Sequence, residues 1–82
     1  MASEVAAKIL KAALLDIRLL ARRGEAAQVE ALADAVHNVP MRLLAGDLEY
    51  ERFLSDLKRY QLKYGEASSR NYPLMLEKSL AG

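Results

Sequence analysis

Apolar residues recur at intervals of three and four through most of this 82-residue chain, and glycine or proline interrupts the pattern. The interruptions lie at Gly24, Pro40, Gly46, Gly65 and Pro73. The spacing puts apolar side chains on one face of an α-helix, and glycine and proline end or begin helices. No run of four or more residues alternates as a strand would. The sequence therefore predicts an all-α protein: a single domain over residues 1–82, folded as a compact bundle of four or five helices.

The interruptions also set the bounds of the expected helices. Long helices are predicted over residues 3–23 and 47–64, with a shorter helix over residues 25–37. Further short helices are expected to open at Pro40 and at Pro73, where proline suits the first turn. We expect the two long helices to run antiparallel and the short helices to fill the gaps between them.

Apolar periodicity predicts which side chains each helix buries. In the short helix after Pro40, we expect Met41, Leu43 and Leu44 to pack inward, and we expect Asp47 to cap the long helix that follows. In the first long helix, the predicted core stripe consists of Val5, Ile9, Leu10, Ala13, Leu14, Ile17, Leu20 and Ala21.

Charge and cysteine usage narrow the classes of function. Twelve basic and eleven acidic residues give a net charge of +1, which does not supply the basic surface that nucleic acid requires. The chain has no cysteine and so no disulfide or thiolate metal site, and we expect a cytoplasmic protein. Lys8, Lys11, Asp16 and Arg18 interrupt the first helix, which argues against a signal peptide or a membrane span.

The only histidine, His37, lies near the end of a predicted helix, followed by Asn38 and Pro40. It could share one side of that helix with Glu30 and Asp34, an arrangement that could hold a metal or orient a general base. A structural zinc site needs four nitrogen or sulfur ligands, and one imidazole is present. We therefore assign His37, Asn38 and Pro40 to helix termination and loop anchoring, with partner contact as the alternative. We expect no metal, no cofactor and no catalytic residue.

All five aromatic residues lie in the second half of the chain, and four of them are tyrosine. Tyrosine can bury its ring while its hydroxyl stays in water, and tyrosine and arginine are enriched at protein–protein hot spots. The aromatic stripe is therefore either core or interface. Aromatic and basic groups can also stack bases, but the near-neutral charge weighs against nucleic acid. The residues that we expect to contact a partner protein are Arg59, Tyr60, Tyr64, Arg70 and Tyr72.

Leu15 and Leu19 lie one turn apart, outside the predicted core stripe of the first helix. Exposed leucines are common and need no special role. The alternative is a second contact surface, covered by a partner protein or by the C-terminal segment. Basic residues on the polar side of this helix also suit a membrane-surface helix, but the helix lacks boundary Trp or Phe and we expect its neighbours to cover its apolar side. We therefore expect no membrane partner.

The stretch RRGEAAQVEALADAVHNVPMRLLAG, residues 22–46, resembles segments of small bacterial helical proteins of the toxin-immunity type, and residues 47–64 resemble them more loosely. Such immunity proteins are cytoplasmic, and each binds and neutralises a cognate toxin. Immunity proteins of the colicin-nuclease type are strongly acidic, whereas this chain is nearly neutral. The resemblance transfers no functional residue, because it contains no diagnostic motif.

Together these observations predict a non-enzymatic protein-binding module. Its most concrete form is an inhibitor that occludes the active or binding site of a bacterial toxin. The alternative is a self-associating structural protein, a homodimer in which Leu15 and Leu19 meet their symmetry mates.

Overall fold

The computed structural model describes residues 2–68 and 70–81, and these ranges are helical for most of their length, with no strand. The all-α class and the small helical bundle that the sequence predicts are therefore confirmed. The helices in these ranges are α1 (Ala2–Arg22), α2 (Ala26–Val36), α3 (Val39–Ala45), α4 (Tyr50–Tyr64) and α5 (Tyr72–Ala81).

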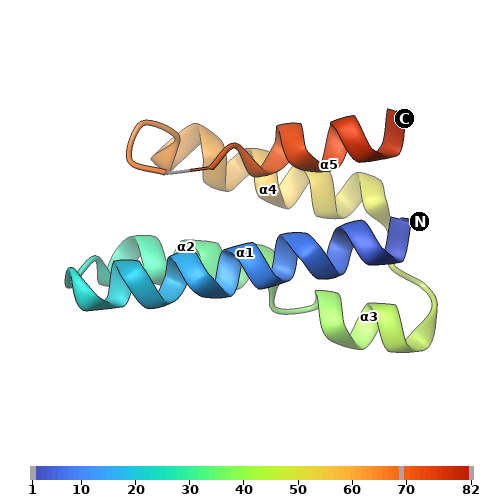
Figure 1. Ribbon diagram of the computed structural model, residues 1–82, viewed down its shortest axis with the longest axis horizontal. Coiled ribbons are helices and arrows are strands. Elements are labelled where there is room, and N and C mark those ends of the chain that lie inside the picture. The colour runs from blue at the N-terminus through green and yellow to red at the C-terminus, as the bar shows by residue number, and fades with distance from the viewer. Residues whose placement is uncertain (1, 69, 82) are drawn as a thin grey trace.

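Four of these helices form an up-down-up-down arrangement, with α3 at its edge (Figure 1). α2 and α5 each pack against both α1 and α4. The two long helices, α1 and α4, therefore lie across the bundle from each other and run in the same direction (Figure 1). The expectation that they run antiparallel is wrong, because α3 continues in the direction of α2 and returns the chain to the end where α1 begins.

The buried face of α1 is rotated from the predicted stripe. Leu14 and Ala21 were expected inside and are exposed. The rotation follows from the main neighbours of α1, because α2 and α5 cover it from different sides. The positions of α1 that are buried between them are Ala6, Ile9, Ala13, Asp16 and Leu20.

The ends of α1 and α3 follow local rules. Gly24 and Gly46 both have a positive φ, 75° and 73°, a conformation that costs glycine little. After Gly46 the chain departs from expectation, since α4 begins at Tyr50, with Glu49 in the N-cap position. Asp47 does not cap α4; its carboxylate accepts a hydrogen bond from Arg42 at 3.1 Å. The short extended segment between α3 and α4 carries the chain from the edge of the bundle back into it.

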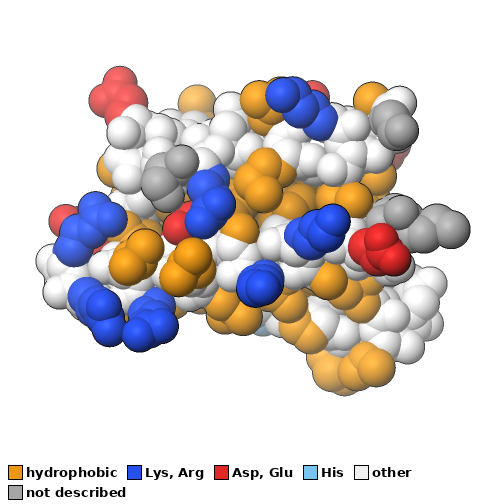
Figure 2. All heavy atoms as spheres, viewed as in Figure 1, with side chains coloured by type: hydrophobic (Ala, Val, Ile, Leu, Met, Phe, Trp, Pro, Cys, Tyr) orange, Lys and Arg blue, Asp and Glu red, His pale blue; other side chains and the backbone are white. Residues whose placement is uncertain are grey.

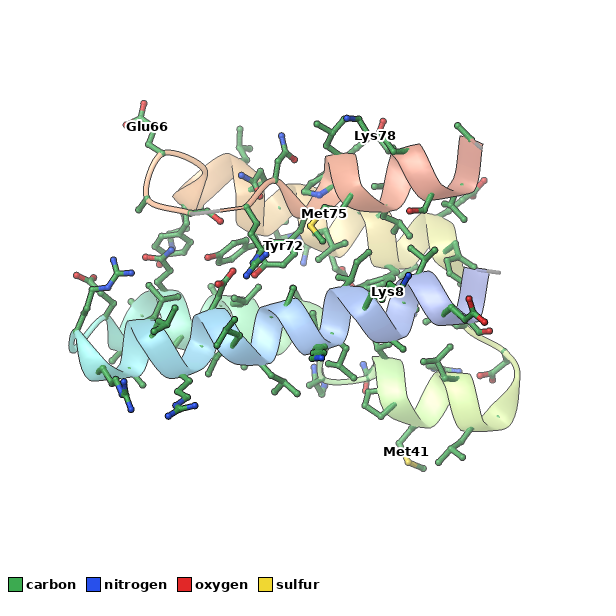
Figure 3. All side chains as sticks on the ribbon, in the orientation of Figure 1. Lys8, Met41, Glu66, Tyr72, Met75 and Lys78 are labelled. Carbon is green, nitrogen blue, oxygen red and sulfur yellow. The ribbon has the colours of Figure 1, made fainter. Side chains whose placement is uncertain are left out.

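α3 turns its largest apolar side chains outward. Met41 is 69% exposed and Leu44 is 84% exposed, so the expectation that they pack inward is wrong. Val39 is buried and Leu43 is half-buried. A helix of seven residues at the edge of the bundle, packed against α1, has one narrow side to bury, and Met41 points away from α1 (Figure 3). No helix in the described part of the chain is long and apolar enough to cross a membrane.

Candidate functional site

The predicted contact residues divide among three places. Tyr60 and Tyr72 are buried in the core. Arg70 lies beside Asp16 at the junction of α1 and α5. The other four reach the surface, where Arg59 and Tyr64 line a groove between α2 and α4, and Leu15 and Leu19 lie on α1.

At the junction of α1 and α5, the buried carboxylate of Asp16 accepts hydrogen bonds from residues in the C-terminal third of the chain. Asp16 is 6% exposed. The Tyr72 hydroxyl donates a hydrogen bond to its Oδ2 atom, and Arg70 Nε lies 3.2 Å from the same atom and 3.4 Å from Oδ1. These groups tie the start of α5 to the middle of α1, so the cluster stabilises the fold.

Electrostatics in this cluster favour an un-ionised tyrosine. Burial, reinforced by the hydrogen bond to Asp16 and by the charge of that carboxylate, raises the pKa of Tyr72 above its ordinary value. The charge of Arg70 acts in the opposite direction and is outweighed. The Tyr72 hydroxyl therefore keeps its proton and serves as a permanent donor to Asp16.

Tyr60 occupies the neighbouring part of the core. Gln28 Nε2 donates to its hydroxyl at 2.9 Å, and its ring meets the Tyr72 ring edge-on, with 6.1 Å between centroids. The expectation that Tyr60 and Tyr72 contact a partner therefore disagrees with their burial, because other helices already cover both rings. Sequence analysis missed the polar partners Asp16 and Gln28. For Asp16 a signal was present, since it falls at helical spacing between the core residues Ala13 and Leu20.

A groove runs between α2 and α4, which we call the α2–α4 groove. One wall comes from α2 and the turn after it, with Asp34, His37 and Asn38. Small and aromatic side chains line its floor, including Ala31, Ala35 and Tyr60. The wall from α4 consists of Arg52, Asp56, Arg59, Lys63 and Tyr64.

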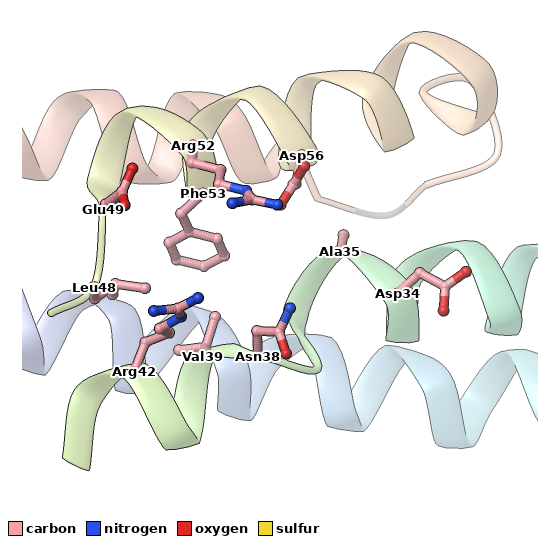
Figure 4. Close-up of a pocket in the computed structure, with 10 residues that line it drawn as sticks. All are labelled: Asp34, Ala35, Asn38, Val39, Arg42, Leu48, Glu49, Arg52, Phe53 and Asp56. Atoms are coloured by element: carbon pink, nitrogen blue, oxygen red, sulfur yellow. The ribbon is translucent and has the colours of Figure 1, made fainter. Parts of the chain in front are cut away.

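The groove continues toward α3 into a second hollow (Figure 4). The residues that line both are Asp34, Ala35, Asn38, Arg52 and Asp56. Phe53 points from α4 into this hollow, toward α3 and Arg42 (Figure 4). The two hollows together form an open surface with apolar groups at its base and charges along its edges.

Three of the predicted contact residues, Arg59, Tyr60 and Tyr64, line the groove. Tyr64 is half-buried, its ring centroid 5.5 Å from that of Tyr60, and the Lys63 ammonium lies 5.5 Å from the Tyr64 centroid. Arg59 is exposed beside them. Arg59 and Tyr64 thus line the same groove as His37, which the sequence placed in a separate set.

The turn after α2 has the structure expected of a helix terminus. His37 is the C-cap of α2, and its Nδ1 atom lies 3.0 Å from the Asp34 carbonyl oxygen. Asn38 is the N-cap of α3, and Pro40 lies in the first turn of that helix. Across the described residues, no three histidine or carboxylate side chains group together as metal ligands would.

The outward side of α1 forms a second candidate surface. Leu15 is 45% exposed and Leu19 is 40% exposed, one turn apart on this side. Basic side chains gather along α1 on the face that Figure 2 shows, with hydrophobic side chains between them.

No protein-family model, curated protein or solved structure matches this chain. Both surfaces are therefore interpreted from their own geometry.

Proposed function

We propose that this protein is a non-enzymatic protein-binding module whose α2–α4 groove holds one segment of a partner protein. The observation that carries the proposal is that Arg59, Tyr64 and His37 all line one open groove with an apolar floor. Tyrosine and arginine supply much of the energy at protein interfaces. A groove between two helices also suits an amphipathic helix, which lays its apolar side on the floor.

Charges along the groove indicate the chemistry of that segment. The α4 wall carries three basic groups, Arg52, Arg59 and Lys63, and a single acidic group, Asp56. The opposite wall carries Asp34. A partner helix with acidic side chains along the edge that faces α4 would match this pattern, and complementary charges speed association and fix its direction.

The most concrete form of this function is toxin neutralisation in the cytoplasm. The resemblance of residues 22–46 to immunity-type proteins supports it, and this stretch supplies the α2 wall of the groove. Binding would act by occlusion, since the groove and its rim would cover a site on the toxin. This protein would recognise the toxin through its own aromatic and basic groups. Strongly acidic immunity proteins differ, because they mask basic nucleases.

The proposal is tested by affinity capture of the tagged protein from its native lysate, followed by binding measurements on the captured partner. Arg59→Glu and Tyr64→Ala are expected to weaken binding at least tenfold, a loss typical of hot-spot residues. Lys78→Glu is the matched control, because it changes charge on α5, away from the groove, and is expected to bind as wild type. If folded Arg59→Glu and Tyr64→Ala bind as tightly as the control, the groove is not the contact site.

Self-association is the second candidate, and the exposure of Leu15 and Leu19 favours it. In a symmetric dimer each leucine would meet its copy, but so would neighbouring cations such as Lys11 and Arg22, and like charges repel. We therefore expect a monomer by light scattering at low salt. A dimer that Leu15→Glu abolishes would establish self-association instead. Recovery of the bait alone in the affinity capture would agree with that result.

A further inference from the structure

Basic and acidic residues are unevenly distributed along the chain, although the net charge is near zero. Residues 2–23 contain five basic and two acidic residues, whereas residues 24–82 contain seven basic and nine acidic residues. One of the two acidic groups in the first segment, Asp16, is buried and paired with Arg70. The exposed surface of α1 therefore carries a concentrated positive charge that the net charge does not reveal.

Four of these cations and two leucines share the outward side of α1, which we call the basic face. Its members are Glu4 at the N-terminal end, followed by Lys8, Lys11, Leu15, Arg18, Leu19 and Arg22. They follow one another at helical spacing and all are exposed, since α2 and α5 cover other sides of α1. Figure 3 shows Lys8 on the side of α1 that faces the viewer, the same side on which Figure 2 shows the basic groups. The two leucines lie among the cations.

We propose that the basic face docks α1 on the surface of an anionic lipid bilayer. Each lysine or arginine close to such a surface raises partitioning about fivefold, so four together give substantial binding. Leu15 and Leu19 can enter the boundary between headgroups and acyl chains, and the long basic side chains can reach the phosphates around them. The inference rests on α1 and is independent of the function proposed for the α2–α4 groove.

Shape and side-chain chemistry favour a bilayer over other anionic partners. The basic face is the convex side of a single helix, and a fluid bilayer adapts to it without a matching cavity. Nucleic acid bases stack on aromatic groups, and all aromatic residues lie between Tyr50 and Tyr72. The expectation of no membrane partner rested on the lack of Trp or Phe in this helix and on the covering of its apolar side by neighbours. Leu15 and Leu19 lie on the other side of α1 and are exposed.

Co-sedimentation with lipid vesicles tests the proposal. The protein is expected to bind vesicles of phosphatidylglycerol and phosphatidylcholine in equal amounts, and to remain free with phosphatidylcholine alone. Added salt should weaken binding because it screens the charges. Lys11→Glu with Arg18→Glu should abolish binding, since each reversal lowers partitioning on the order of 25-fold. Leu15→Ala should lower partitioning roughly fivefold, because fewer methylene groups leave water.

The matched control is Arg59→Glu with Lys63→Glu, which changes the net charge equally but leaves the basic face intact. This control should bind vesicles nearly as wild type while losing any partner of the groove, so the two proposals can fail separately. All these positions are exposed, and circular dichroism verifies that each variant is folded. The inference is overturned if binding does not depend on phosphatidylglycerol or if the two double variants behave alike. It is also overturned if the face binds duplex DNA or a captured protein but no vesicles.

Discussion

Two groups of tyrosine, arginine and aspartate lie on different sides of this bundle. At the α1–α5 junction, Tyr72 and Arg70 direct their polar atoms to Asp16 in the core. In the α2–α4 groove, Tyr64 and Arg59 lie across from Asp34 on an open surface. The residue types are the same, but Asp16 and Tyr72 are buried at the junction, whereas the groove is open to solvent.

Residue type and spacing therefore do not determine whether a polar group stabilises the fold or remains available for binding. A buried polar group must find a partner inside the protein, because leaving it unpaired costs more than a hydrogen bond gains. An exposed polar group is solvated by water and can exchange that water for a partner. The junction is therefore expected to control stability, and the groove to control recognition.

Loss of the Asp16 carboxylate should have the largest effect on stability. Asp16→Ala leaves the buried Tyr72 hydroxyl and the Arg70 guanidinium without this acceptor, and is expected to cost about 3 kcal/mol. That is a large part of a total on the order of 8 kcal/mol for a domain of this size. Urea unfolding measures the change.

Asp34→Ala in the groove is the matched control for Asp16→Ala. It removes an exposed carboxylate and should change the free energy of unfolding by no more than about 0.5 kcal/mol. Equal losses from the two variants would contradict the distinction between junction and groove.

Alkaline pH should destabilise the protein through Tyr72. Its pKa is raised in the folded state, so the unfolded chain releases this proton first, once the pH passes about 10. The contribution of the protonated Tyr72 hydroxyl to the free energy of unfolding is complete below that pH. It declines as the pH rises, by up to about 1.4 kcal/mol for each pH unit. Urea unfolding across this range should show a shallower decline for Tyr72→Phe than for wild type. An unchanged decline in Tyr72→Phe would mean that other groups cause it.

Near neutral pH, removing a single hydroxyl should lower stability more at the α1–α5 junction than in the α2–α4 groove. Tyr72→Phe keeps the buried ring but withdraws a donor from Asp16, and is expected to cost about 1.5 kcal/mol. Tyr64→Phe withdraws a hydroxyl at the edge of the groove, and the expected cost is below about 0.5 kcal/mol. Paired urea titrations compare the variants directly. A larger loss from Tyr64→Phe than from Tyr72→Phe would reverse the roles given to these tyrosines.

Replacement of His37 should have the smallest effect on stability. His37→Ala loses the contact of its ring with the Asp34 carbonyl oxygen at an exposed helix end, which is worth at most about 1 kcal/mol. Binding of a groove partner should weaken in the same variant, because His37 lines the wall. Thermal unfolding and binding measured on one preparation test both effects. Loss of a bound metal from this variant would instead assign His37 a ligand role.

Most of the secondary structure follows from local patterns in the sequence. Helical spacing and the breaks at Gly24, Pro40 and Gly46 place the helices to within a few residues of those observed. These features are local, since a helix hydrogen bond joins residues four apart and a left-handed glycine acts within one turn. The start of α4 is the exception, because the segment after Gly46 must cross from α3 into the bundle.

Which side of each helix is covered depends on how the helices pack together. The rotation of α1 that buries Asp16 depends on Tyr72, which lies 56 residues further along the chain. The same packing placed Tyr60 inside, left Tyr64 at a groove, and turned Met41 outward on α3. A wide apolar stripe is compatible with several rotations of a helix, and the contacts that choose among them join residues far apart in sequence. For that reason the helices could be predicted from the chain, whereas the surfaces they present could not.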